Sequence, residues 1–208
     1  LLRDFDCDGL PDLFTGYQNS VHVYRNTSVT PGVPTFEAYA LPLMASWDFG
    51  TGAQELPIVC LTIDKPAIFD VDNDGDLDFI SFTETSTTMY RFSGQSACGL
   101  DLICTNRCYG MVSEGSEDNT LFIGEEHSCS FNVIEPESRP APIKEAVMER
   151  DGVHAGGAIT ALQLDGDNFH DLLISDVTYP TMSGLMLENA NDGQDSTCLL
   201  YTSDAADD

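Results

Sequence analysis

The stretch FDVDNDGDLDFISF (residues 69–82) places an aspartate at every second position around a glycine, and an apolar run follows directly. Positions 1, 3, 5 and 9 of this loop are acidic and position 6 is glycine: Asp70, Asp72, Asp74, Asp78 and Gly75. Carboxylates this close repel one another, whereas Ca²⁺ takes six to eight oxygen ligands at about 2.3–2.6 Å. Glycine permits the sharp turn that lets the carboxylates face one point. The stretch therefore favours a calcium-binding loop over an acidic surface turn.

Two further stretches repeat the pattern. In DFDCDGLPDLF (4–14) the same five positions are held by Asp4, Asp6, Asp8, Gly9 and Asp12. In QLDGDNFHDLL (163–173) they are held by Gln163, Asp165, Asp167, Asn168 and Asp171. The third copy loses one carboxylate to glutamine and its glycine to asparagine, which tolerates left-handed backbone better than most residues. We expect this third site to bind a cation more weakly than the other two.

The segments after each loop exclude an EF-hand and predict strands. An EF-hand needs a bidentate glutamate at position 12 and flanking helices, but position 12 here is Thr15, Ser81 or Ile174. Short runs rich in β-branched and aromatic residues follow each loop, and a second such run comes at 20–26, 87–93 and 183–189. Each unit therefore reads loop, strand, turn, strand, and the chain is expected to be all-β. Further strands are predicted at 35–41, 56–63 and 66–71.

This unit, with VYRN (23–26) on its second strand, resembles the FG-GAP/VCBS repeat, the blade of integrin-α-like β-propellers. The resemblance implies that hairpin loops at 4–12, 70–78 and 163–171 bind Ca²⁺ through positions 1, 3, 5 and 9. The ligands it implies are Asp4, Asp6, Asp8, Asp12, Asp70, Asp72, Asp74 and Asp78, and in part Gln163, Asp165, Asp167 and Asp171. Three units are fewer than the four to eight blades of a closed ring, so we expect a partial β-propeller.

Longer segments resemble secreted VCBS-repeat proteins of Bacteroidetes-type bacteria: DKPAIFDVDNDGDLDFISF, CGLDLICTNRCYGMVSE and HAGGAITALQLDGDNFHDLLISDVTY. This resemblance implies an extracellular or cell-surface protein. We expect a propeller segment over 1–197, interrupted by a Cys-rich insertion at about 95–150 that holds a short helix at 142–150. The last residues, CLLYTSDAADD (198–208), resemble a translated sequencing adapter of metagenomic assemblies, so we expect an artefactual tail outside the fold.

The net charge of the chain indicates which classes of partner it is not expected to bind, and its cysteines indicate the cellular compartment in which it folds. The net charge of −27 argues against nucleic acids and anionic membranes, because both are bound through Lys and Arg. Four of the seven cysteines cluster, at Cys98, Cys104, Cys108 and Cys129. They lack the paired spacing of a zinc site, and in an exported protein disulfides are expected. The three possible pairings among them stay open, and Cys7 and Cys60 can be free or paired.

The sequence shows no motif of a catalytic site. It lacks a G-x-S-x-G elbow, a P-loop and a G-x-G-x-x-G turn, and carboxylates that hold a metal stay ionised and are poor acid–base catalysts. We therefore expect a non-catalytic, calcium-stabilised binding or adhesion module that contacts a glycan or a protein. Two alternatives remain: a propeller domain of a secreted polysaccharide-active enzyme, and a structural spacer on the cell surface.

Overall fold

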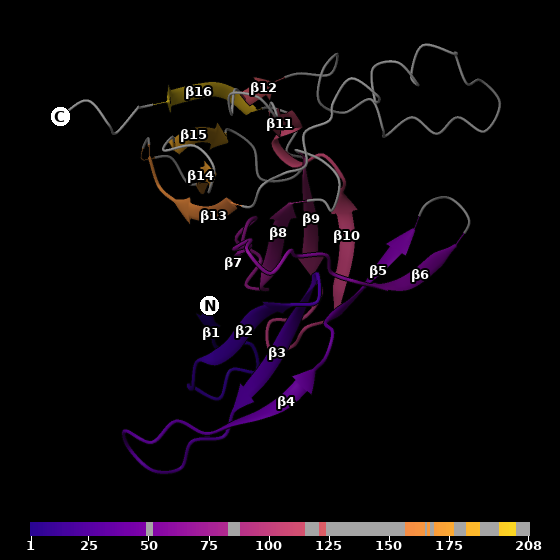
Figure 1. Ribbon diagram of the computed structural model, residues 1–208, viewed down its shortest axis with the longest axis vertical. Helices are drawn as coiled ribbons and strands as arrows, with labels where there is room; N and C mark the ends of the chain where they lie inside the picture. Colours follow the sequence, from indigo (N-terminus) through magenta and orange to yellow (C-terminus); the bar gives the residue numbers. More distant parts are fainter. Residues whose placement is uncertain are drawn as a thin grey trace.

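The chain is all-β. The computed structural model describes residues 1–48, 52–82, 88–114, 121–123, 157–164, 166, 169–176, 182–187 and 196–202. Within these residues, strands form several sheets, none of which closes into a barrel, and the helical element is a single 3₁₀ turn, Tyr109–Met111. Successive sheets follow the chain along the long axis of the molecule, from the indigo N-terminal sheet to the orange and yellow C-terminal sheet (Figure 1).

The first sheet has four antiparallel strands in chain order: β1 (Leu2–Arg3), β2 (Asp12–Tyr17), β3 (Ser20–Asn26) and β4 (Phe36–Ala40). A two-residue turn joins β2 to β3, and Tyr17 pairs with Ser20 across it. Both turn residues, Gln18 and Asn19, adopt positive φ values of 51° and 59°. This conformation matches the right-handed twist of the two strands and gives a tight hairpin.

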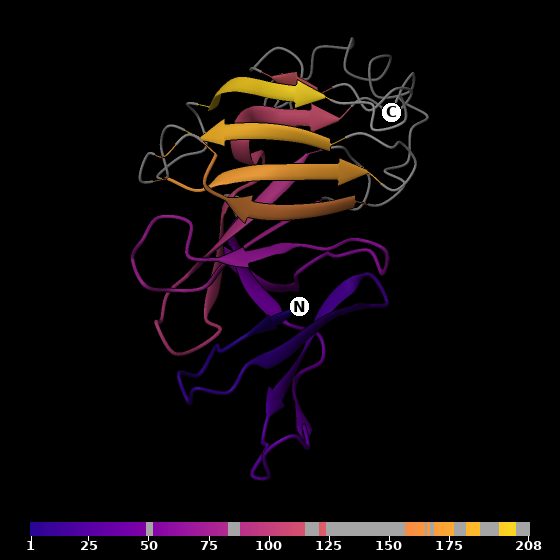
Figure 2. The same cartoon turned by 90° about the vertical axis from the view of Figure 1, so that its left-hand side faces the viewer.

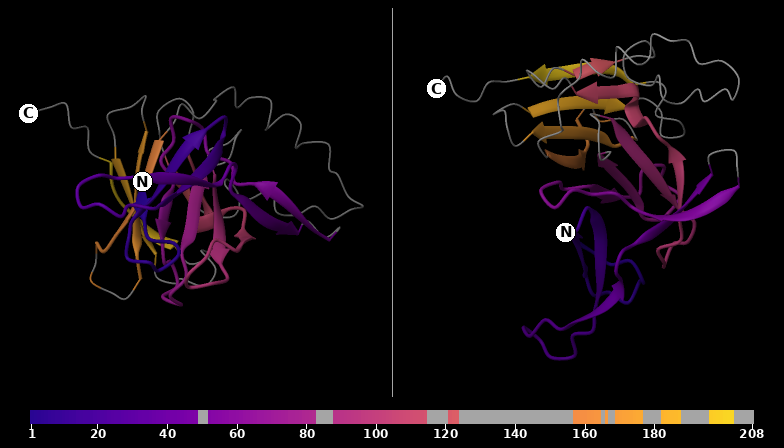
Figure 3. Two further views of the ribbon diagram at one scale, coloured as in Figure 1. Left: turned by 90° about the horizontal axis from the view of Figure 1, so that it is seen from below. Right: turned by 45° about the vertical axis from the view of Figure 1, so that its right-hand side comes forward.

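The second sheet has six strands in the order β6-β5-β10-β9-β8-β7. Their bounds are β5 (Met44–Asp48), β6 (Ala53–Pro57), β7 (Ala67–Phe69), β8 (Asp78–Phe82), β9 (Met89–Gly94) and β10 (Leu102–Asn106). Neighbouring strands are antiparallel except β5 and β10, which are parallel through Ile103 and Ser46. The hairpin of β5 and β6 extends the edge of this sheet and projects from the side of the molecule (Figure 3).

The third sheet is again a four-stranded antiparallel meander, and its strands lie one above another in Figure 2. Its strands are β13 (Gly157–Leu162), β14 (Asp171–Asp176), β15 (Met182–Leu187) and β16 (Ser196–Thr202). A separate two-stranded ladder joins β11 (Val112–Glu114) to β12 (Leu121–Ile123). The second and third sheets also touch where Lys65, just before β7, lies beside β13: the amide of Lys65 donates to the carbonyl of Gly157, and the amide of Ile159 donates to the carbonyl of Lys65.

Strand β8 is buried on both faces, which places the second sheet between two apolar cores. Phe79 and Phe92 point into a core shared with the first sheet, where the ring of Phe79 lies 5.7 Å from that of Phe14. Ile80 and Phe82 point the other way, into a core shared with β13, β14 and β15. Because successive side chains of a strand alternate between faces, a continuous apolar run such as FISF is what a sheet covered on both sides requires.

The disulfide pattern differs from the expected pairing within the cysteine cluster. Cys7, in the first acidic loop, is bonded to Cys98, in the turn between β9 and β10, with a Cα–Cα distance of 5.3 Å. Cys108 is also disulfide-bonded, whereas Cys60 and Cys104 are free thiols, and Cys129 lies outside the described residues. The expectation of two bonds among the four clustered cysteines is therefore wrong, and the first sheet is covalently tied to the second.

Three other expectations meet the structure as follows. The strand predicted at 56–63 is wrong beyond Pro57, where β6 ends and Val59 forms only an isolated bridge with Ser20. Residues 198–202 of the expected tail pair with β15 as part of strand β16 (Ser196–Thr202), so this part belongs to the third sheet. Strand β10, inside the expected insertion, is part of the second sheet, and the helix expected at 142–150 lies outside the described residues.

We predict that replacing Cys7 and Cys98 together by serine lowers the free energy of unfolding by about 2–4 kcal/mol, because the bond closes a long loop of the unfolded chain. Urea denaturation measures the change. Cys104→Ser, which removes a free thiol, is the matched control and should cost less. Peptide mapping without reduction should recover the Cys7–Cys98 link, and recovery of a Cys98–Cys104 link instead would contradict the described pairing.

Candidate metal centre

The acidic loops share a backbone conformation that turns the chain twice. The residue at position 4 has a positive φ in all three loops: 59° at Cys7, 61° at Asn73 and 85° at Gly166. The glycine at position 6 has φ of 84° at Gly9 and 93° at Gly75. Left-handed backbone at these positions curls the chain around the carboxylates, and glycine and asparagine adopt it most easily.

Hydrogen bonds from the loop's own amides orient the aspartates at positions 1 and 5. The position-six amides of Gly9 and Gly75 each donate to the position-one carboxylate, Asp4 or Asp70, over 2.9 Å. The amide of position 7 donates to the position-five carboxylate over 2.8 Å in the first loop and 2.9 Å in the second. The first two loops therefore have the same internal structure, although they lie in different sheets.

The aspartate at position 9 fastens each loop to the hairpin behind it. Asp12, Asp78 and Asp171 are fully buried. One carboxylate oxygen of each accepts the amide of position 2, at 3.0 Å from Phe5, 3.0 Å from Val71 and 2.6 Å from Leu164. The other accepts an amide of the following strand, at 2.7 Å from Asn26, 2.8 Å from Gly94 and 3.1 Å from Leu187. This pair of hydrogen bonds from the position-nine carboxylate to the backbone is common to all three units.

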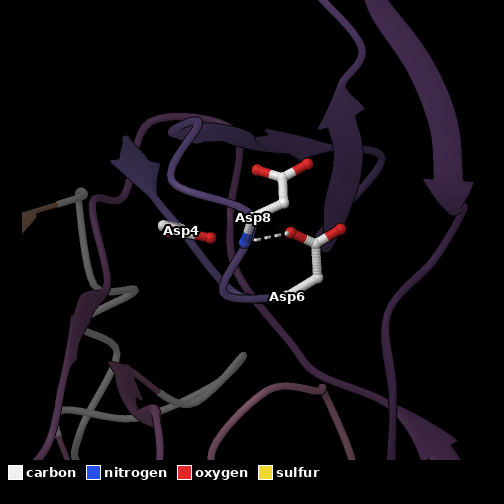
Figure 4. A group of neighbouring side chains, drawn as sticks. All are labelled: Asp4, Asp6 and Asp8. Atoms are coloured by element: carbon white, nitrogen blue, oxygen red, sulfur yellow. Dashed lines mark hydrogen bonds between the residues drawn. The ribbon is translucent and has the colours of Figure 1, made fainter.

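The first loop gathers three carboxylates at the protein surface. One oxygen from each of Asp4, Asp6 and Asp8 lies within 4.8 Å of the other two. Figure 4 shows the three side chains on one loop, with the amide of Asp8 donating to Asp6 Oδ1 over 3.3 Å. Arg25 on β3 reaches the same group, with Nε 2.5 Å from Asp6 Oδ2 and Nη2 3.6 Å from Asp8 Oδ2.

The second loop gathers a deeper set of carboxylates. Asp70, Asp72 and Asp78 each offer one oxygen within 4.8 Å of the other two. Arg91 on β9 contributes the positive charge, with Nη2 2.6 Å from Asp72 Oδ2 and 3.2 Å from Asp78 Oδ2. Burial raises the pKa of Asp78 to about 6, although the amides of Gly94 and Val71 and the charge of Arg91 act in the opposite direction.

The donor sets fit a hard divalent cation. Two oxygens on opposite sides of a Ca²⁺ ion at about 2.4 Å are about 4.8 Å apart, and in both groups the three carboxylate oxygens lie within that distance of one another. In the second loop, Asp72 Oδ1 is buried and has no hydrogen-bond partner among the described residues. An unpartnered buried carboxylate oxygen is costly, and a cation bound there would remove that cost. The residues able to hold it are Asp4, Asp6 and Asp8 in one loop, and Asp70, Asp72 and Asp78 in the other.

The structure separates the expected ligands by position. Positions 1 and 3 belong to both groups, whereas the third member is Asp8, at position 5, in the first loop and Asp78, at position 9, in the second. Asp12 and Asp74 are held by backbone amides and do not belong to these groups. In the third loop, Asp171 makes the two hydrogen bonds common to position 9 and Gln163 occupies position 1, whereas Asp165 and Asp167 lie outside the described residues.

Sequence reasoning missed the two arginines. Each lies thirteen residues after the position-nine aspartate of its loop, within a Tyr-Arg pair. The repeated spacing was a usable signal. An arginine on the second strand of a hairpin can reach the carboxylates of the acidic loop that precedes the first strand. The special backbone at position 4 was also missed, although asparagine and glycine at two of the three positions indicate it.

Comparison of the chain with protein-family models, curated proteins and solved structures found no match. The function of the protein is therefore inferred from the geometry of the loops. Among the described residues there is no helix with the length and apolar character needed to span a membrane.

We predict that Asp12→Asn lowers the free energy of unfolding by about 1–3 kcal/mol, because the new amide group leaves either the Phe5 or the Asn26 N–H without an acceptor. Denaturation in the presence of a chelator measures this cost without any contribution from metal. The same change at Asp101, an exposed aspartate outside the loops, is the control and should have almost no effect. Equal stability of the two variants would contradict the role assigned to position 9.

Proposed function

We propose that the protein is a calcium-stabilised, non-catalytic extracellular binding or adhesion module built from FG-GAP/VCBS-like units. The observation that carries the proposal is the recurrence of one hydrogen-bonded loop structure in two different sheets, each gathering three carboxylate oxygens within 4.8 Å. An acidic turn needs no such convergence, whereas calcium coordination does. When bound, the ion would supply positive charge that offsets the repulsion among the carboxylates.

The covalent structure supports a location outside the cell. A disulfide persists in oxidising compartments and is rare in the cytosol, and the Cys7–Cys98 bond has one end in the first acidic loop. The same bond fixes this loop against the second sheet, as a bound ion would. A loop held by both a cross-link and a cation provides a rigid platform for neighbouring surface segments.

A surface suited to ligand contact lies beside the first loop. Leu10 and residues 28–34, between β3 and β4, line an open pocket of about 410 Å³. Two valines of this segment point outward, with 94% of Val29 and 54% of Val33 exposed. Binding residues are often carried on loops that a rigid scaffold positions. We assign the contact with a glycan or protein ligand to this pocket.

We expect chelation to lower the melting temperature by at least about 5 °C, since each site saturated at a hundredfold excess over its Kd adds about 2.7 kcal/mol. Differential scanning calorimetry with and without EDTA measures the shift. Isothermal titration should show calcium uptake by the intact chain. If calcium is not taken up, the proposed metal role fails.

We further expect Asp72→Ala to remove calcium binding at the second loop and leave the first loop unchanged, because Asp72 belongs only to the second group of carboxylates. Titration calorimetry should show one binding event fewer. Asp101→Ala, the same change outside the loops, should keep every event. Loss of all events in Asp72→Ala would show that the loops do not bind independently.

The binding role has a separate test. Capture of the protein on immobilised polysaccharides and extracellular-matrix proteins should depend on calcium and should weaken in Val29→Asp, with calcium uptake unchanged. Capture that persists in Val29→Asp would place the ligand elsewhere. Cleavage of a polysaccharide by the protein would instead favour the enzymatic alternative.

A further inference from the structure

The second acidic loop already holds a cation that belongs to the protein. Arg91 on β9 is 3% exposed, and its Nη2 lies between two carboxylates, 2.6 Å from Asp72 Oδ2 and 3.2 Å from Asp78 Oδ2. Asp72 is thus shared between two roles: Oδ2 bonds to the guanidinium, while Oδ1 is buried without a partner among the described residues. A metal ion approaching Oδ1 would meet the positive charge of Arg91 on the same carboxylate.

The first loop provides an internal comparison. Arg25 occupies the equivalent place in the sequence, but 48% of its side chain is exposed, against 4% for Arg91. The difference comes from the register of the two hairpins. Arg91 lies opposite Ile80, two residues beyond Asp78. Arg25 follows Tyr24, and Tyr24 lies opposite Leu13, the residue after Asp12. Arg25 can swing into solvent at little cost, because exposed ion pairs contribute little. Arg91 cannot, because a buried charge separated from its partner is strongly destabilising.

Arg91 also connects its loop to the apolar core between the second and third sheets. Its guanidinium carbon lies 5.9 Å from the ring centroid of Tyr109, which is 1% exposed and belongs to that core together with Leu185. Burial alone would lower the pKa of Arg91, but the carboxylates of Asp78 and Asp72 outweigh it and raise the pKa, so the side chain keeps its charge. Arg91 therefore contacts both the acidic loop and this core.

We propose that Arg91 is the resident cation of the second loop: it holds the loop folded when calcium is absent and has to release Asp72 when calcium enters. The inference rests on the proposed calcium role of the loops and adds its regulation. Because a tethered guanidinium competes for the same carboxylate, the second loop binds calcium more weakly than the first, where Arg25 is free to leave. The two loops then fill in sequence as calcium rises.

The test is Arg91→Gln, which should change two quantities in opposite directions. Calcium affinity of the second loop should rise about tenfold, because a charge competing at a few ångströms is removed. The melting temperature in EDTA should fall by about 5–10 °C, because Asp72 and Asp78 lose their counter-charge. A merely structural role for Arg91 would lower both quantities. Arg91→Lys keeps the charge and should keep both near the wild-type values.

Calcium titration followed by ¹H–¹⁵N NMR separates the loops, because the amides of Gly9 and Gly75 bond to the position-one carboxylates of the first and second loop. In the wild type, Gly9 should shift at lower calcium than Gly75. In Arg91→Gln the Gly75 midpoint should fall while that of Gly9 stays, and the matched Arg25→Gln variant should change Gly75 little.

Each other outcome overturns the inference. A Gly75 midpoint that is unchanged or higher in Arg91→Gln would do so while leaving the calcium role of the loops intact. If neither glycine shifts with calcium in any variant, both the inference and the proposed function fail. Should Arg91→Gln not fold, a crystal structure of the wild type in calcium decides: Arg91 still bonded to Asp72 beside a bound ion would refute the exchange.

Discussion

The structure depends on a buried aspartate that satisfies two backbone amides at once. At position 9 of each unit, one carboxylate oxygen accepts an amide at the start of the loop and the other accepts an amide of the second hairpin strand. Burying a carboxylate is costly unless its oxygens are bonded, so the loop can close only when the hairpin is formed. Loop and hairpin are consequently one folding unit, and the other acidic residues of the loop are held wherever this unit places them.

Closing each loop on its hairpin brings several carboxylates close together. The protein offsets this negative charge differently in the first and second loops. In the first loop, a disulfide to the second sheet fixes the backbone, and a half-exposed arginine accompanies Asp6 and Asp8. In the second loop, a buried arginine stands between Asp72 and Asp78. Neither device balances all the carboxylates, and the net charge of the whole chain is −27. The proposed divalent cation in each loop would supply positive charge that neither device provides.

Local features of the fold could be predicted from the sequence, and distant ones could not. The strand expected at 20–26 is β3 with the same bounds. It could be predicted because the alternation of side chains along a strand and a two-residue turn both depend only on neighbouring residues. The apolar run after Asp78 likewise indicated a strand, which is β8. The Cys7–Cys98 bond and the parallel pairing of β5 with β10 join residues far apart in the chain, and no local pattern encodes such partners. The depth of Arg91 depends on the length of its hairpin, which spacing alone does not determine.

We propose that the first two loops each enclose one divalent cation. A crystal structure of the protein soaked in a lanthanide that substitutes for calcium, with anomalous scattering to locate the ion, tests it most directly. One anomalous peak is expected within bonding distance of Asp4, Asp6 and Asp8, and another beside Asp70, Asp72 and Asp78. Peaks confined to other surface carboxylates, with both loops unchanged and without an ion, would contradict it.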